Sequence, residues 1–413
     1  RMIKVNLIER KSPNYVAMRQ CSSLRIWTLV CITTVVFLVV YYKIYPQRLA
    51  SYRESVSVKA LTNKKFNIIE FSTNTPSRTD SSRVNSHCPN EMMKIALVAC
   101  GKRLDEAIVS IKSAITFTSC PLEIYFFLEP DSIAKGNVIV SKFPRSIHKR
   151  VNFYLMPINY PVTRDISGEE WKKLFKPCAS QRLFFPTILT NIDSLIYVDS
   201  DVLFLTPIEK VWNFFHQMNG SQLAAVAPEH EDPSIAWYSR FAKHPYYKPH
   251  GINSGVMLMN LTRMRSFGWL EYILPIYKEY RLKLAWGDQD ILNILFHFHS
   301  DKLFVFDCDW NYRPDHCMYT SICKAAEERG IAILHGSRGV YHNNKQPIFK
   351  VIYDSLSNFD LQSSVQLLLQ RILSQLLTDQ SSNCGKESHI FIKTFEKLQL
   401  FMQQLAPFPE PHY

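Results

Sequence analysis

Short apolar runs alternate with segments of helical periodicity through the middle of the chain. Uninterrupted apolar runs of this length are typical of buried strands, whereas apolar residues spaced three and four apart indicate helices. Strands are predicted at residues 95–99, 122–128, 151–156, 223–227 and 256–259, with another that begins at 195 and stops at Asp199 and Asp201. Helices are predicted at residues 104–117, 180–189 and 291–297. This alternation predicts an α/β, Rossmann-like layer sandwich with a mostly parallel central sheet, over residues 94–355.

The pattern changes on both sides of this predicted core. Residues 43–93 are polar, rich in Ser, Thr and Asn, and lack a sustained apolar period, which indicates a stem. Beyond residue 355, one helical stripe and a second apolar segment at residues 391–405 predict a C-terminal helical extension, residues 356–413, packed on the core. The stripe consists of Leu361, Val365, Leu368, Leu369, Ile372 and Leu376. A helix that binds a partner protein is the alternative.

Residues 26–42 carry no charge and are just long enough to cross a membrane as a helix. Basic residues dominate positions 1–25, where Glu9 is the one acid, so the positive-inside rule predicts a cytosolic tail and a lumenal catalytic part. We therefore predict a transmembrane signal-anchor and a single-pass type II topology. A cleaved signal peptide is the alternative, but no small-residue cleavage site follows the apolar run.

Composition narrows the class of protein further. The 413 residues are 46% hydrophobic and 20% charged, which is ordinary globular material, and the net charge is +12. Lys and Arg are spread along the chain without a basic-aromatic cluster, which argues against a nucleic-acid partner. Eight of the ten cysteines lie beyond the predicted span, an even number that permits full disulfide pairing without indicating which cysteines pair. Asn219 and Asn260 begin glycosylation sequons.

Asp199 and Asp201 are the strongest candidates for chemistry. Alternate side chains of an extended chain point the same way, so both carboxylates can hold one hard cation at the carboxyl end of a strand. Open α/β sheets bind ligands at this edge, and the cation would hold a diphosphate. A surface turn is the ordinary explanation for an Asp-x-Asp triplet.

Several segments, taken in order, resemble the retaining sugar-nucleotide glycosyltransferases of family 8. They are residues 182–186, 197–201, 253–260 and 286–293, followed by His335 and Gly336 with Lys345 downstream. Within that family the chain is similar to glucoside xylosyltransferases, through residues 170–178, 227–231, 310–317 and 335–341. One departure is that Lys345 is followed by Gln-Pro where many members have Pro-Trp.

The resemblance implies a GT-A fold and an enzyme of the endoplasmic reticulum or Golgi membrane. Such an enzyme transfers xylose from UDP-xylose, in α-1,3 linkage, to O-linked glucose on the EGF-like repeats of Notch-type glycoproteins. Two alternatives within the family are another UDP-sugar donor and a xylosyl acceptor. A catalytically silent sugar-binding module is a third alternative, which a missing metal ligand would favour. A metal-dependent phosphohydrolase would need further His and Asp residues, which the sequence does not offer.

The resemblance also assigns roles to residues. Asp199, Asp201 and His335 would bind Mn²⁺, or Mg²⁺ in competition, and Asp199 would also contact the ribose. Asp288 and Gln289 would lie beside the anomeric carbon as the catalytic pair, although Asp288 also suits a helix N-cap. The resemblance favours retention by same-face attack, in which the departing diphosphate takes the proton of the acceptor. A covalent glycosyl-enzyme is the alternative, but the sequence shows no second carboxylate pair with hydrolase-like roles.

The remaining candidates bind the donor or the acceptor. Arg182 and Lys345 would complement the diphosphate by charge, and Gly336 would let a backbone N–H approach phosphate. The donor sugar would be lined by Asn253, Ser254 and Gly255, for which a plain turn is the alternative. Glu229 and Glu231 would pair with acceptor hydroxyls or serve the structure alone.

Overall fold

The computed structural model describes residues 69–70, 88–160, 166–174, 178–377 and 381–405. The predicted tail, the predicted anchor at residues 26–42 and most of the predicted stem lie outside these ranges. Within them, no helix is both long enough and apolar enough to cross a membrane. The described residues therefore belong mainly to the predicted core and its C-terminal extension.

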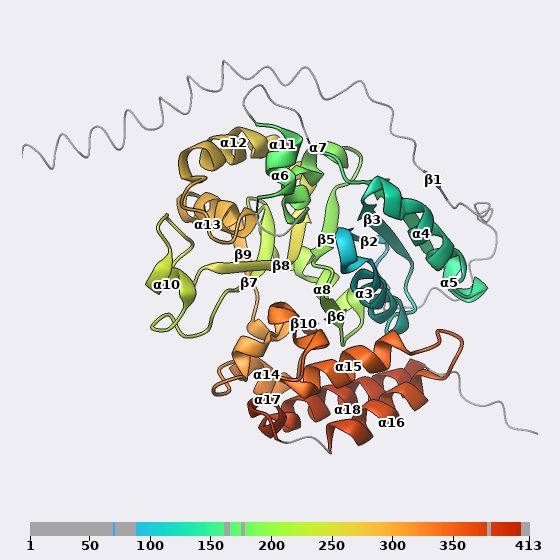
Figure 1. The fold of residues 1–413 in the computed structure, drawn as a ribbon. Coiled ribbons are helices and arrows are strands. Elements are labelled where there is room, and N and C mark those ends of the chain that lie inside the picture. The colour runs from blue at the N-terminus through green and yellow to red at the C-terminus, as the bar shows by residue number, and fades with distance from the viewer. Residues whose placement is uncertain (1–68, 71–87, 161–165, 175–177, 378–380, 406–413) are drawn as a thin grey trace, which may run out of the picture. The chain divides into compact units, whose positions relative to one another are not determined.

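The described residues form a mixed eight-stranded sheet (Figure 1) in the order β1-β4-β3-β2-β5-β8-β7-β9. The strands are β1 Ile69–Glu70, β2 Met93–Ala99, β3 Leu122–Leu128, β4 Val151–Pro157, β5 Ser194–Val198, β7 Ala224–Pro228, β8 Ile252–Asn260 and β9 Leu303–Val305. In this order, the neighbouring strands β4, β3, β2 and β5 are all parallel, and β7 is parallel to β9. β8 runs antiparallel to both β5 and β7. The α/β class is confirmed, and the sheet is mixed because β8 is reversed and because β1 pairs antiparallel with β4.

The apolar runs of the central strands are continuous because both faces of the sheet are buried. Along β2, Ile95 and Leu97 belong to one core cluster, whereas Ala96 and Val98 belong to another. Successive side chains of a strand point to opposite faces, so a strand covered on both sides carries no polar alternation. This explains why the strands were predictable from run length.

Helices cover both faces. One core cluster includes residues of α3 Leu104–Thr116, α4 Pro130–Ser141, α5 Arg145–His148 and α8 Ile208–Trp212. The other includes residues of α6 Gly168–Lys172, η3 Ala179–Phe184, α7 Phe185–Ile188, α11 Leu261–Phe267, α12 Trp269–Tyr280 and α13 Asp288–Phe298. Shorter described elements are η2 Gly101–Arg103, α9 Phe214–Gln217, α10 Trp237–Phe241, η4 Ser300–Lys302, η5 Cys308–Asn311, η6 Pro314–His316 and η7 Ser337–His342.

The predicted helix at residues 180–189 is two short elements instead of one. A 3-10 helix, η3, ends at Phe184, and a single α-helical turn, α7, begins at Phe185 with Pro186 in its first turn. Proline has no N–H to donate to the carbonyl of residue 182, so a continuous α-helix would lack that hydrogen bond. The predicted helices at residues 104–117 and 291–297 are confirmed as α3 and α13.

A two-stranded antiparallel sheet and a group of helices complete the described fold. β6 Val202–Phe204 pairs with β10 Ile333–His335. The helices are α14 Lys324–Arg329, α15 Pro347–Ser357, α16 Val365–Leu376, α17 Asn383–Lys386 and α18 Ser388–Leu405. Figure 1 shows α15, α16 and α18 side by side, and they share a core with Leu203 of β6 and Leu334 of β10. The predicted C-terminal helices are confirmed as α16 and α18, but Leu361, the first residue of the predicted stripe, lies in a turn before α16.

The eight cysteines beyond the predicted anchor are all paired. The described residues contain the disulfides Cys88–Cys120, Cys100–Cys178, Cys308–Cys323 and Cys317–Cys384. Cys317 and Cys323 are close in sequence, yet each pairs with a different cysteine. The Cys317–Cys384 bond connects α17 to the segment that follows η6.

Candidate functional site

Asp199 and Asp201 lie in a turn that joins β5 to β6. The N–H of Asp199 donates to the carbonyl of Gly255 at 2.9 Å, and the N–H of Val202 donates back to the carbonyl of Asp199 at 3.2 Å. The prediction that the two carboxylates follow strand alternation was therefore wrong in its geometry, because the extended chain ends at Val198. The turn nevertheless brings both acids to the carboxyl end of β5, where the prediction placed them.

His335 completes the predicted group of ligands. It is the last residue of β10 and pairs with Val202 across the β6–β10 ladder. Its Nε2 lies 3.7 Å from Asp199 Oδ2 and 3.4 Å from Asp201 Oδ1. One ligand atom from each of the three residues lies within 4.8 Å of the others. Two carboxylate oxygens and one imidazole nitrogen are a donor set that suits a divalent cation.

Asn311 holds the imidazole of His335 in a defined orientation. Its side chain is fully buried, and its Oδ1 lies 2.9 Å from His335 Nδ1. When Nδ1 carries the proton and donates it to this amide oxygen, Nε2 presents a lone pair towards the carboxylates, as a metal ligand requires. Asn311 in turn donates to Asn253 Oδ1 at 2.8 Å. No local sequence pattern indicates this role of Asn311, although residues 310–317 carry part of the resemblance.

Gly255 makes room for the same imidazole. A Cβ at this position would lie 2.2 Å from His335 Cε1 and 2.6 Å from Nδ1, far inside van der Waals contact. Its N–H donates to Asn253 Oδ1 at 3.0 Å, so Asn253 and Gly255 both serve the position of His335. Ser254, between them, binds Gln289 through its N–H at 3.1 Å.

Arg182 is buried and contacts the carboxylates of Asp199 and Asp288. Its Nη2 lies 3.1 Å from Asp199 Oδ1 and its Nε lies 2.6 Å from Asp288 Oδ2. Its other contacts are the carbonyls of Ser254 and Ala179. Burial alone favours the neutral guanidine, but the two carboxylates outweigh it and raise the pKa of Arg182. The protein itself therefore engages this cation, which fixes Asp199 relative to Asp288.

Asp288 and Gln289 form the first turn of α13. Burial raises the pKa of Asp288, while the charge of Arg182 opposes that rise. The N-cap position belongs to Gly287, so the alternative that Asp288 is the N-cap was wrong. Gln289 donates from Nε2 to the Tyr238 hydroxyl at 3.3 Å while its Oε1 accepts from Ser254. The first turn of α13 and the start of β8 are thus joined at the same edge as Asp199.

Gly336 and Lys345 lie less directly in the site. The N–H of Gly336 donates to the carbonyl of Asp201 at 2.7 Å, and a Cβ at Gly336 would lie 2.2 Å from the ring of Tyr341. The glycine therefore serves a close packing contact, and its N–H already has a protein partner. Lys345 is exposed just before α15, and within the described ranges its ammonium has no hydrogen bond or ion pair.

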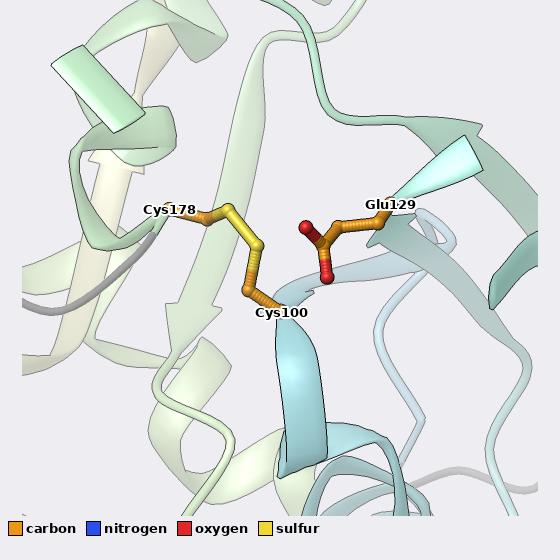
Figure 2. A group of neighbouring side chains, drawn as sticks. All are labelled: Cys100, Glu129 and Cys178. Carbon is orange, nitrogen blue, oxygen red and sulfur yellow. A yellow bond between two sulfur atoms is a disulfide. The ribbon is translucent and has the colours of Figure 1, made fainter. Parts of the chain in front are cut away.

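A second group of possible metal ligands has a structural explanation. Cys100 and Cys178 lie beside Glu129, but their sulfurs are bonded to each other (Figure 2). The carboxylate of Glu129 accepts from the N–H of Gly101 at 2.7 Å and pairs with Lys172 at 3.0 Å. The Gly101 N–H, followed by Lys172, lowers the pKa of Glu129. A disulfide offers no thiolate, so this group is a stabilising contact.

Known proteins are similar in sequence to this chain over most of the described core. The sequence profile of "Glycosyl transferase family 8" matches residues 94–336. Glucoside xylosyltransferase 1 of Gallus gallus is 48% identical over 321 residues, which cover 75% of this chain and 73% of that protein. Glucoside xylosyltransferase 2 of Xenopus laevis is 44% identical over 339 residues, 79% of each chain. The crystal structure of mouse xyloside xylosyltransferase 1 is 18% identical, with a TM-score of 0.44 over 60% of this chain and 98% of that one.

Proposed function

Because the chain belongs to glycosyl transferase family 8, we propose that it is a glucoside xylosyltransferase. The reaction moves xylose from UDP-xylose, in α-1,3 linkage, to the O-linked glucose of EGF-like repeats such as those of Notch-type receptors. The observation that carries this proposal is identity of nearly one half, over three quarters of the chain, to proteins of that name. The convergence of Asp199, Asp201 and His335 supports an active transferase over a silent sugar-binding module.

The proposed metal ion is Mn²⁺, with Mg²⁺ as competitor. Asp199, Asp201 and His335 would hold it, and the bond from His335 Nδ1 to Asn311 leaves Nε2 available as a ligand. When bound, the ion would neutralise the charge that develops on the departing diphosphate.

The protein's own residues then hold the donor sugar. Asp288 and Gln289 would meet the donor hydroxyls and the anomeric carbon, because Ser254 and Arg182 fix them beside Asp199. Asp288 Oδ2 contacts Arg182 Nε at 2.6 Å, and this contact fixes the orientation of the buried carboxyl group. Same-face attack with the diphosphate accepting the proton would give retention.

We also propose the type II topology in the endoplasmic reticulum or Golgi membrane. Full pairing of the eight cysteines supports an oxidising compartment. Asn219 is exposed and suits a glycan. Asn260 does not, because it is buried and its side chain caps α11 by accepting from the N–H of Arg263.

A donor screen tests the function. The purified full chain is incubated with Mn²⁺, an O-glucosylated EGF-like repeat and UDP-sugars supplied one at a time, and the acceptor is weighed by mass spectrometry. We expect a gain of one pentose with UDP-xylose alone, abolished by EDTA and by Asp201→Asn.

The control acceptor is the same repeat without its glucose, which should gain nothing. A hexose gained by the repeat, or xylose added only to a xylosyl acceptor, would support the alternative specificities within the family. Binding of UDP without transfer from any donor would support the silent module.

A further inference from the structure

Three side chains outside the predicted site meet at the edge of the Asp199–Asp201–His335 group. Arg103 is the last residue of η2, which follows β2 at its carboxyl end, and Glu106 is in the first turn of α3. His342 is the last residue of η7, after β10. These segments are far apart in the sequence, and Glu106 joins them.

Glu106 is buried and uses both carboxylate oxygens. Oε2 binds Arg103 Nη1, and Oε1 lies 2.6 Å from His342 Nε2. Its side chain is only 5% exposed, whereas those of Arg103 and His342 are 41% and 52% exposed. A buried carboxylate therefore holds two solvent-facing nitrogen groups in a fixed arrangement.

Packing fixes His342 independently of that bond. The preceding Tyr341 is buried against Gly336 and stacks on Tyr353 with ring centroids 4.8 Å apart. The ring of His342 packs edge-on against the same Tyr353 at 5.1 Å. The position of His342 is thus built by the loop after β10 and by α15.

Arg103 faces the proposed metal ligands. Its Nη1 lies 4.0 Å from Asp201 Oδ2. Partial burial favours the neutral guanidine, but Glu106, with Asp201 and Asp199 adding to it, raises the pKa of Arg103. Nε and Nη2 of Arg103 have no partner among the described residues. Arg182, in contrast, is 4% exposed and occupied by two carboxylates and two carbonyls.

We propose that Arg103, held by Glu106 and flanked by His342, binds the diphosphate of the nucleotide-sugar donor. Its free donors can form two parallel hydrogen bonds to phosphate oxygens, a geometry that a guanidinium supplies and an ammonium does not. The location fits, because α/β sheets hold nucleotides at the carboxyl ends of their strands. The identity of the donor as a UDP-sugar rests on the proposed function.

Calorimetric titration of the full chain with UDP, at saturating Mn²⁺, tests this role without any turnover. We expect Arg103→Ala to weaken UDP binding by about tenfold to hundredfold, the effect of losing hydrogen bonds to a charged group. The UDP affinity of Arg103→Lys should lie between those of Arg103→Ala and the wild type. The matched control is Lys102→Ala, which removes the same charge from the neighbouring exposed position and should change affinity by less than about twofold.

Thermal unfolding and the Mn²⁺ affinity without UDP are measured alongside. If Arg103→Ala does not fold, Arg103→Gln keeps a donor towards Glu106 and carries the same expectation. Equal losses for Arg103→Ala and Lys102→Ala, or no loss for either, would overturn the inference. If Arg103→Ala weakens UDP binding but the wild type transfers no xylose, the proposed function is overturned and the inference stands. If the wild type transfers xylose but Arg103→Ala binds UDP as tightly as the wild type, the inference is overturned and the proposed function stands.

Discussion

At the scale of single residues, Glu229 illustrates the effect of burial on charge. It follows β7, and burial raises the pKa of its carboxyl to about 7, against the opposing charge of Arg313. Asp315 adds to the rise and Arg338 opposes it. Among the described residues, nothing hydrogen-bonds to Glu229 Oε2. The folded protein therefore takes up a proton here at a pH where an unfolded chain has already released it.

Glu229→Gln should accordingly change the pH dependence of stability. The unfolded carboxyl ionises near 4.5 and the folded one near 7, so the wild type loses stability as pH rises between these values. Glutamine does not titrate, and we expect the variant to gain up to about 3 kcal/mol relative to wild type between pH 4 and pH 8. Urea unfolding at both values measures the difference. The exposed Glu396→Gln is the control, and an equal response of both variants would contradict the burial argument.

At the scale of elements, the reversed strand β8 brings residues 253–255 to the site. Because β8 is antiparallel to β5 and β7, its first residues lie at the edge where those strands end. A parallel strand would have placed the same residues at the opposite edge. The orientation of β8 therefore decides that Gly255 lies under His335 and that Asn253 bonds to Asn311.

Gly255→Ala tests this arrangement. The new Cβ would lie 2.2 Å from His335 Cε1, so the imidazole must leave its present position beside Asp199 and Asp201. We expect Mn²⁺ affinity to fall roughly tenfold or more, as for other changes that disturb the support of a metal ligand. Titration with Mn²⁺ followed by electron paramagnetic resonance measures it. Gly220→Ala is the control, since a Cβ there meets nothing within 4 Å, and equal affinity of both variants would show that His335 is not a ligand.

At the scale of the whole described molecule, the C-terminal helix α18 packs against the segments that carry Asn311 and His335. The ring of Phe391, in α18, packs edge-on against Tyr312 at 5.8 Å. Tyr312 follows Asn311, and its N–H donates to the carbonyl of Ile333 in β10. Thr394, also in α18, accepts from the N–H of Ile331 at 2.6 Å. The helical extension is therefore part of what positions Asn311 and His335.

Phe391→Ala should destabilise the fold by about 3–5 kcal/mol, because the side chain is fully buried and leaves a cavity. Urea unfolding gives the free energy. Leu400→Ala, in the same helix but 61% exposed, should change it by less than about 0.5 kcal/mol. Similar losses in both variants would mean that α18 contributes through helix formation and not through its contact with the core.

The central strands β2, β3, β4, β5, β7 and β8 were predictable because a strand buried on both faces is a continuous apolar run. The helices α3, α13, α16 and α18 were predictable because a helix repeats its apolar residues. The three-residue strands β6, β9 and β10 were not predicted, because so short a run carries no period. The Asp199–Asp201 pair was visible for a local reason too, since it ends the apolar run of β5. The helix at residues 180–189 was misjudged because the effect of Pro186 on the preceding hydrogen bonds outweighed the apolar spacing.

By itself, the sequence determined the α/β class, the long central strands, the family and the candidate ligands, all of which are encoded in local order. The tertiary structure decided which distant segments meet, because strand pairing and packing join residues that no local period connects. The β6–β10 ladder brings His335 to the acids, the reversed β8 supplies Gly255, and Asn311 orients the imidazole. Burial between two carboxylates likewise made Arg182 a support of the site, and left the solvent-facing position to Arg103.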